Sequence, residues 1–110
     1  MTVSAEPVPH DVRAVAGVDR VLHEPARLLI AATLYALEAS DFLYLLRETG
    51  LTKGNLSSHL AKLEQAGYVG IEKTYRGKVP LTLCRLTEPG RSAFDTYREQ
   101  LRRVASGLPE

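Results

Sequence analysis

The stretch that decides the fold is LTKGNLSSHLAKLEQAGYV, residues 51–69 of the chain. Within it, Leu56, Leu60 and Leu63 recur at spacings of four and three residues. These spacings place the three side chains on one face of a helix that turns about 100° per residue. The stretch therefore predicts an amphipathic helix whose leucine face packs into a hydrophobic core.

Both ends of this helix have suitable capping residues. Thr52 can accept a hydrogen bond from a free backbone N–H at the start, and Gly67 can adopt the left-handed conformation that ends many helices. The face opposite the leucines carries small residues, amides, hydroxyls and two cations, with a histidine at its edge: Lys53, Asn55, Ser57, Ser58, Ala61, Lys62, Gln65 and His59. Such groups pair with base edges and phosphates in the major groove of DNA. An ordinary solvated helix face is the alternative.

Size and composition indicate one soluble domain. The chain has 110 residues, of which 45% are hydrophobic and 25% charged. We expect residues 1–10, which contain Pro7 and Pro9, to be a flexible arm and residues 11–110 to form the domain. No apolar run approaches the ~20 residues of a membrane span, and the N-terminus lacks the features of an export signal. The lone Cys84 cannot form an internal disulfide, so a reducing, cytoplasmic setting is expected.

The positive charge is concentrated on the predicted helix and the segment after it. Residues 1–52 carry four Lys/Arg and seven Asp/Glu, a net charge of −3, whereas residues 53–85 carry six and two, a net charge of +4. Residues 86–110 carry four of each and are neutral. A phosphate-facing surface needs cations in this place, although the net charge of the whole chain is only +1.

The segment before the decisive stretch begins irregularly and continues into a clear helix. The apolar pattern of Asp11–Leu22 predicts a short or broken helix, with Gly17 as the expected break. The next helix, Arg27–Leu37, follows Pro25, which is tolerated in a first turn, and it is apolar on most sides. A helix of this kind must be covered on most sides, which in so small a domain favours a second chain as part of the cover.

A further helix is predicted at Phe42–Thr49, directly before the decisive stretch. Its N-cap is expected to be Ser40 or Asp41, and Gly50 ends it. The order of helix, tight glycine turn and polar-faced helix is the helix-turn-helix arrangement.

After Gly67 the period of the pattern changes from helical to alternating. Tyr68–Tyr75 and Leu81–Leu86 are rich in residues that favour strands, and both are predicted to be strands. The connection Arg76–Pro80 contains a glycine and two cations, so the pair is predicted to form a basic hairpin. A charged turn that only protects the strand edges is the alternative.

The chain is predicted to end in a long helix. Thr87 is its expected N-cap, and Glu88 and Pro89 suit its first turn. Its large apolar residues recur in a heptad-like seam: Phe94, Tyr97, Leu101, Val104 and Leu108. The seam suits packing on the N-terminal helices of a partner chain. Packing on its own domain is the alternative.

The chain resembles the winged helix-turn-helix transcriptional regulators of the MarR and ArsR type, in particular their short single-domain subgroup. The resemblance covers roughly residues 23–103 and rests on HEPARLLI at 23–30, LTKGNLSSHLAKLEQAGYV at 51–69 and LTEPGRSAFDTY at 86–97. It implies an α+β, mainly α fold with a two-stranded β-wing and N- and C-terminal dimerisation helices. It also implies a symmetric homodimer that binds double-stranded DNA with its third helix in the major groove and with its wing beside it.

The resemblance also implies which residues face DNA. The positions that match the family's DNA-facing surface are Thr52, Lys53, Asn55, Ser57, Ser58, Lys62, Arg76 and Lys78. We expect Asn55 and Ser58 to face base edges. Phosphates are expected to be held by Lys53, Ser57 and Lys62. The metal-sensing members of these families use paired cysteines, whereas here Cys84 stands alone. Because His10, His23 and His59 show no ligand spacing, we expect neither a metal nor another cofactor.

The leading functional hypothesis is a homodimeric repressor of nearby genes. Its target would be an inverted repeat with half-sites about 34 Å apart. A small molecule wedged between the shared helices would release the DNA, and five aromatic residues could line its pocket or belong to the core instead: Tyr35, Phe42, Tyr44, Phe94 and Tyr97.

A winged-helix module for protein interaction is the rival from another class. In that case the polar helix face would be solvated and the terminal seam would bind another protein. An enzyme is not expected, because the sequence has no paired carboxylates at a site, no Cys-His constellation and no glycine loop for phosphates.

Overall fold

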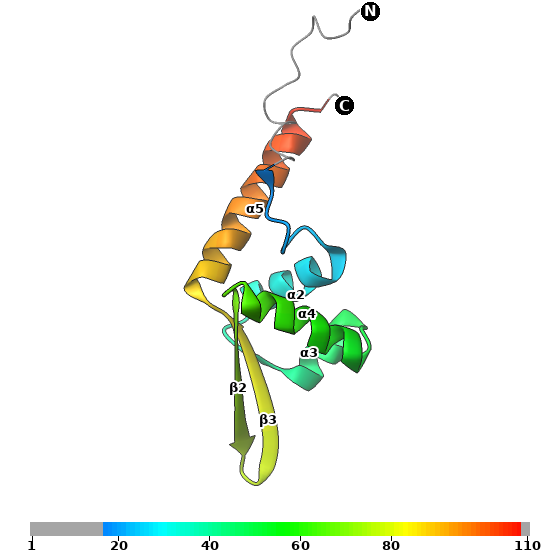
Figure 1. Ribbon diagram of the computed structural model, residues 1–110, viewed down its shortest axis with the longest axis vertical. Coiled ribbons are helices and arrows are strands. Elements are labelled where there is room, and N and C mark those ends of the chain that lie inside the picture. Colours follow the sequence, from blue (N-terminus) through cyan, green and yellow to red (C-terminus); the bar gives the residue numbers. More distant parts are fainter. Residues whose placement is uncertain (1–16, 109–110) are drawn as a thin grey trace, which may run out of the picture.

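The computed structural model describes residues 17–108, which form four α-helices and a three-stranded antiparallel sheet. The elements in chain order are α2 (Pro25–Ala36), β1 (Ser40–Asp41), α3 (Phe42–Thr49), α4 (Lys53–Gln65), β2 (Val69–Arg76), β3 (Val79–Leu86) and α5 (Glu88–Ser106). Helices α2, α3 and α4 gather into one body, from which the β2–β3 hairpin and α5 extend in different directions (Figure 1). The predicted mainly helical winged helix-turn-helix is confirmed.

The core lies where α2, α3 and α4 meet the base of the sheet and the first part of α5. Its largest fully buried side chains are Leu22, Ile30, Leu34, Leu45, Leu56, Leu63 and Cys84. Leu60 is only 3% exposed, so the leucine face of α4 packs inward as the periodicity predicts. Each buried leucine stabilises the fold by about 1.5–3 kcal/mol relative to an exposed one.

Every helix in the described part of the chain begins with a side-chain cap. The caps are Glu24, Asp41, Thr52 and Thr87, and each accepts a hydrogen bond from a backbone N–H of the first turn. Of the two expected candidates for α3, Asp41 is the cap. Asp and Thr caps stabilise a helix start by about 1 kcal/mol because they satisfy a donor that has no partner within the helix.

Gly67 completes the C-terminus of α4. It adopts a φ of +83°, and its N–H donates to the carbonyl of Glu64 over 2.9 Å. The N–H of Tyr68 donates to the carbonyl of Leu63 over 2.9 Å. This pair of hydrogen bonds is a Schellman motif, and its left-handed residue favours glycine.

The hairpin is longer than predicted because its turn is shorter. Arg76 pairs with Val79, so only Gly77 and Lys78 form the turn. A positive φ at the first of two turn residues matches a type II′ turn, and Gly77 has a φ of +64°. The prediction of a loop over 76–80 is therefore wrong at both ends. Pro80 is tolerated in β3 because β1 pairs with β3 only at Cys84 and Leu83, so the other edge of β3 is free at Pro80.

Two further features differ from the sequence-based expectation. The two-residue strand β1 was not predicted, and it adds a third strand beside β3. The predicted helix over 11–22 is wrong where it can be seen, because residues 18–24 form turns and bends. The Asp19 carboxylate accepts the N–H groups of Val21 and Leu22 over 2.8 and 3.2 Å, and such local bonds compete with helix formation. Residues 11–16 and the expected arm 1–10 lie outside the described residues.

Helix α5 is packed at its beginning and exposed toward its end. Gly90, Phe94 and Tyr97 are buried, and a Cβ atom on Gly90 would stand 2.1 Å from the carbonyl oxygen of Tyr68. Leu101 and Leu108 are 36% and 53% exposed. The predicted seam therefore packs on its own domain in its first half only. Across residues 17–108, no helix has both the length and the apolar character needed to cross a membrane.

Candidate nucleic-acid interface

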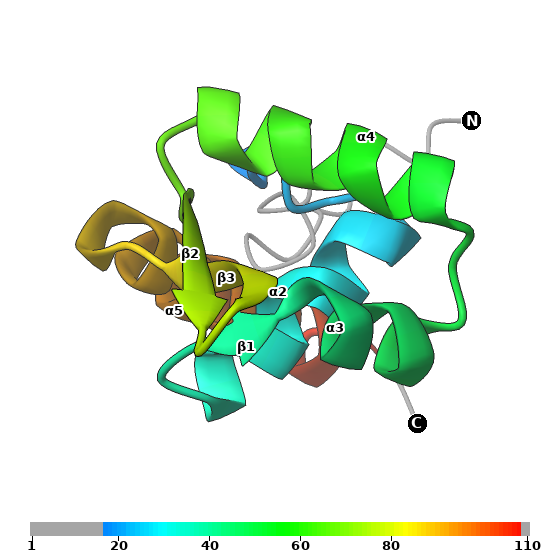
Figure 2. The same ribbon diagram turned by 90° about the horizontal axis from the view of Figure 1, so that it is seen from below.

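The outer face of α4 is open to solvent. All seven residues that the helical periodicity directs outward are exposed: Lys53, Asn55, Ser57, Ser58, Ala61, Lys62 and Gln65. His59 is half-buried at the edge of this face, where its Nδ1 lies 3.3 Å from Nη1 of Arg27. Figure 2 shows α4 along the outside of the body, with the other helices on one side of it only.

The first turn of α4 is capped, and a bound surface can come close to its backbone. The hydroxyl of Thr52 accepts the N–H of Asn55 over 3.1 Å and retains its own proton for donation to a phosphate. Gly54 is exposed, and a Cβ atom there would meet nothing within 4 Å. The backbone of this turn can therefore approach a DNA groove more closely than a helix with larger side chains.

The wing presents different residues on its two faces. The register pairs Ile71 with Cys84 and Lys73 with Thr82, so these residues share the face toward α4. Arg76 belongs to the opposite face, where it borders a groove with Tyr44. Lys78 lies in the turn at the tip and is exposed. Of the two predicted wing cations, the tip residue is free to face DNA, whereas Arg76 points toward the side of α3.

An open groove of about 320 Å³ separates α4 from the wing, and we call it the α4–wing groove. Its lining residues are Phe42, Ser57, Leu60, Ala61, Glu64, Ile71, Lys73 and Thr82. The floor is apolar, and the rim carries hydroxyls and one charge of each sign. The helix face and the wing face thus form one concave surface rather than two separate patches.

Sequence reasoning missed two wing residues on this concave side. Lys73 is exposed on the rim of the α4–wing groove, and Tyr75, which is 68% exposed, follows two residues later on the same face. The alternation of side chains along a strand places both on the face of the buried Val69. The same alternation is present in the sequence, so both residues could have been predicted from it.

The five aromatic residues expected to line an effector pocket lie in separate places within the protomer. Tyr35 and Phe94 stack with ring centroids 4.9 Å apart, whereas the hydroxyl of Tyr97 is 2.8 Å from Nδ1 of His23. Phe42 and Tyr44 line different grooves on the two faces of the wing. They do not form one cavity.

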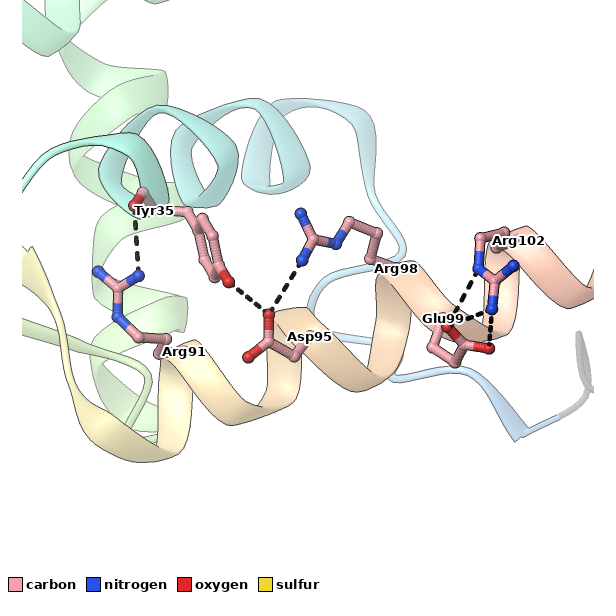
Figure 3. Close-up of polar contacts among 6 residues, drawn as sticks. All are labelled: Tyr35, Arg91, Asp95, Arg98, Glu99 and Arg102. Atoms are coloured by element: carbon pink, nitrogen blue, oxygen red, sulfur yellow. Dashed lines mark hydrogen bonds and ion pairs between the residues drawn. The ribbon is translucent and has the colours of Figure 1, made fainter.

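The polar surroundings of Tyr35 tie α2 to α5. Its hydroxyl donates to the Asp95 carboxylate over 2.6 Å, and the guanidinium groups of Arg91 and Arg98 lie 4.6 and 5.2 Å from its ring centre (Figure 3). Arg91 also donates to the backbone carbonyl of Tyr35 over 3.3 Å. The helix-turn-helix body is therefore fastened to the long helix that leaves it.

The described residues contain no cluster of three or more His, Cys, Asp or Glu side chains suited to a metal ion. Cys84 is buried, and this burial, reinforced by the charges of Asp41 and Glu64, raises the pKa of its thiol to about 11. A thiol in this state is a poor metal ligand and a poor nucleophile. His10 lies outside the described residues.

A polar helix face exposed beside a projecting basic hairpin defines the class of winged-helix DNA-binding proteins. A family model described as a winged helix DNA-binding domain matches residues 26–105. The chain therefore belongs to the winged-helix DNA-binding family.

Three known proteins illustrate the relationship. The chain is 36% identical over 90 residues to the uncharacterized protein MJ0432 of Methanocaldococcus jannaschii, across 81% of this chain and 97% of that protein. It is similar to the transcriptional regulator homologue protein from Pyrococcus horikoshii OT3, with a TM-score of 0.83, 27% identity and coverage of 92% of this chain and 99% of that one. It shares its fold with a MarR-family transcriptional regulator from Silicibacter pomeroyi, with a TM-score of 0.61, 20% identity and coverage of 90% and 64%. The predicted membership of the winged-helix DNA-binding proteins is confirmed, and the fold is shared with a MarR-family regulator.

Proposed function

We propose that this protein is a homodimeric transcriptional repressor that binds an inverted repeat in double-stranded DNA through α4 and the wing. The observation that carries the proposal is the exposed polar face of α4 beside the basic wing. The family supports DNA binding, and the similar protein from Pyrococcus horikoshii is described as a transcriptional regulator homologue. Repression follows most simply from occupancy, because a bound dimer covers DNA that the transcription machinery needs.

In this proposal α4 enters the major groove. Asn55 and Ser58 select bases, because amide and hydroxyl groups can both donate to and accept from base edges. Thr52, Lys53, Ser57 and Lys62 hold phosphates beside them, as does Lys78 at the tip of the wing. The phosphate contacts provide affinity that falls with salt, and the base contacts provide selection.

The second copy is proposed to pack on the exposed end of α5. Leu101 and Leu108 are exposed there and Val104 is half-buried, although all three lie on the seam that begins with buried Phe94 and Tyr97. Figure 1 shows this end of α5 extending well beyond the helix-turn-helix body. Twofold packing would bury the apolar seam and place two α4 helices about 34 Å apart, which matches half-sites one helical turn apart.

Fluorescence anisotropy on a duplex from the protein's own upstream region tests the proposal. Affinity is expected to fall steeply between about 50 and 200 mM salt. Replacement of Lys53, Lys62 and Lys78 by alanine is expected to flatten this dependence. Arg85→Ala is the matched control, because Arg85 pairs with Gly70 on the wing face away from α4. An affinity that does not change with salt contradicts the proposal.

Two further readouts separate this proposal from its rivals. Asn55→Ala is expected to reduce the preference for the upstream duplex over a scrambled one. If the unmodified protein binds neither duplex, the result favours the alternative of a winged-helix module for protein interaction. Release by a small molecule has no support within one protomer, because the five expected aromatic residues do not line one cavity.

A further inference from the structure

A second basic surface lies beside α4, and the sequence did not indicate it. It is an open recess of about 390 Å³, which we call the basic recess. Its described lining residues are Arg20, Val21, Arg27, Lys62, Gln65 and Ala66. Three of them are cations and none is an acid. They come from the turns before α2, from the first turn of α2 and from the C-terminal half of α4.

The positions of these cations are set by the local fold. Nε of Arg27 donates to the carbonyl of Val21 over 2.7 Å, which fixes its guanidinium group against the turn. Arg20 and Lys62 are both exposed. Arg27 thus forms a fixed wall, while Arg20 and Lys62 are free to reach toward a bound group.

The acids nearest to the recess are engaged elsewhere. The Glu24 carboxylate accepts the backbone N–H of Arg27 over 2.7 Å, and this bond is the largest of the effects that lower its pKa. Asp19 accepts two backbone N–H groups and the hydroxyl of Tyr68. These carboxylates stabilise the turn and the helix start. The charge of Glu24 also interacts with Arg27, so Arg20 and Lys62 are the two cations that are left free to face the opening.

The basic recess and the wing lie on opposite flanks of the exposed face of α4. At about 100° per residue, the α4 residues that line the recess and those that line the α4–wing groove are separated by roughly 140° around the helix. Figures 1 and 2 show the same arrangement: the turns at residues 17–24 lie on one side of α4, and the wing projects from the other. The outer face of α4, with Ser58 near its centre, lies between the two.

We propose that the basic recess binds a DNA backbone phosphate on the flank of α4 that faces away from the wing. This inference rests on the proposed function. A helix that enters the major groove has a phosphate backbone on each side of it, and the wing can serve only one of them. Lys62 belongs both to the outer face of α4 and to the recess, so a strand that passes Lys62 continues past Arg20 and Arg27.

Arginine suits this role because its planar guanidinium group can make two parallel hydrogen bonds to a phosphate. The exposed end of α5 and the wing lie at opposite ends of the molecule (Figure 1). In a dimer joined through α5 the wing flank of each α4 therefore faces outward, and the recess flank faces the centre of the operator. The predicted contact is therefore with phosphates between the two half-sites, and the wing contacts those outside them.

Phosphate-ethylation interference with the dimer on its operator tests this assignment. Arg20→Ala is the main variant, since Arg20 is exposed and no partner within residues 17–108 pairs with it. Interference at phosphates between the half-sites is expected to disappear, and interference outside them is expected to remain. Lys78→Ala at the wing tip is expected to give the reverse pattern.

The salt dependence of binding gives an independent readout. Arg20→Ala is expected to lower the slope of log affinity against log salt by about one per recess, whereas Arg20→Lys retains most of it and Arg85→Ala leaves it unchanged. A slope and an interference pattern unchanged by Arg20→Ala, in a variant with the parent's melting temperature, overturn the inference and leave the proposed function intact. Failure of the unmodified protein to bind any duplex overturns both.

A free phosphate anion has the same chemistry as a backbone phosphate and is the alternative occupant of the basic recess. Inorganic phosphate is expected to bind the free parent no better than the free Arg20→Ala variant at constant ionic strength. If inorganic phosphate binds the parent and not the Arg20→Ala variant, while both proteins bind DNA with the same salt slope, the recess binds a small anion rather than the backbone, and the inference is wrong.

Discussion

The thirteen residues of α4 are divided between two faces that have different roles. On the inner face Leu56 and Leu63 are fully buried and Leu60 is 3% exposed. On the outer face every residue between Lys53 and Gln65 that points away from the core is exposed and small, polar or charged. One face therefore determines whether the domain folds, and the other is available for what the domain binds.

This division means that stability and DNA binding can be changed separately. Substitutions on the inner face are expected to alter both, because a helix that is not folded presents no outer face. Substitutions on the outer face are expected to alter binding alone, because exposed side chains contribute little to stability. Four substitutions test this division, from the largest expected change in stability to the smallest.

Leu56→Ala is expected to have the largest effect. Leu56 is fully buried in the core, and replacement of a buried leucine by alanine costs about 2–5 kcal/mol through lost burial and the cavity that remains. Chemical denaturation measures the loss, and DNA binding is expected to fall only in proportion to the unfolded fraction. A variant of full stability that cannot bind DNA would show that the inner face has a second role.

Thr52→Ala is expected to cost about 1 kcal/mol, because the N–H of Asn55 loses its cap. The informative partner variant is Thr52→Asp, which keeps the cap but brings a negative charge to the DNA-facing side. Its melting temperature is expected to match that of the unmodified protein, whereas its affinity for DNA is expected to be lower. If Thr52→Asp and Thr52→Ala bind DNA with equal affinity, Thr52 does not lie near the phosphates.

The sequence predicted this helix well because its signals are local. The leucine spacing, the threonine cap and the glycine after the last turn lie within one short stretch, and each has a direct physical meaning. The same holds for the cap at Thr87 and for the existence of the two wing strands, although not for their length. Where an element is defined by its own residues, the pattern is sufficient.

The features that were missed depend on residues that are distant in the sequence. Strand β1 exists only because Ser40 and Asp41 pair with Cys84 and Leu83, and two residues carry no periodicity. The basic recess joins Arg20 to Lys62, which no local pattern connects. The five aromatic residues expected at an effector pocket lie in separate places within the protomer, since aromatic residues show where apolar area is needed but not which of them will meet.

Gly54→Ala is expected to act in opposite directions on the two properties. An alanine inside a helix is more stable than a glycine by about 0.5–1 kcal/mol, and the space around Gly54 is empty. Stability is therefore expected to rise. Affinity for DNA is expected to fall, because a methyl group would stand where the backbone approaches the groove.

Ser92→Ala on the exposed side of α5 is the matched control for Gly54→Ala, since it also improves helix propensity but lies away from α4. Thermal unfolding and anisotropy are measured on both variants. If Gly54→Ala stabilises the domain and leaves affinity unchanged, the first turn of α4 does not approach DNA closely.

Lys53→Ala is expected to have the smallest effect on stability, within about 0.5 kcal/mol, because Lys53 is exposed. Its effect on binding identifies what Lys53 contacts. A lysine on a phosphate weakens binding to all sequences alike and lowers the salt slope by about one, whereas a lysine on a base edge weakens binding to the operator more than to a scrambled duplex. Equal losses on both duplexes, with a lower slope, are expected. A loss confined to the operator would assign Lys53 to the residues that read bases rather than to those that bind phosphates. In either case the stability that the inner face provides stays independent of the outer face.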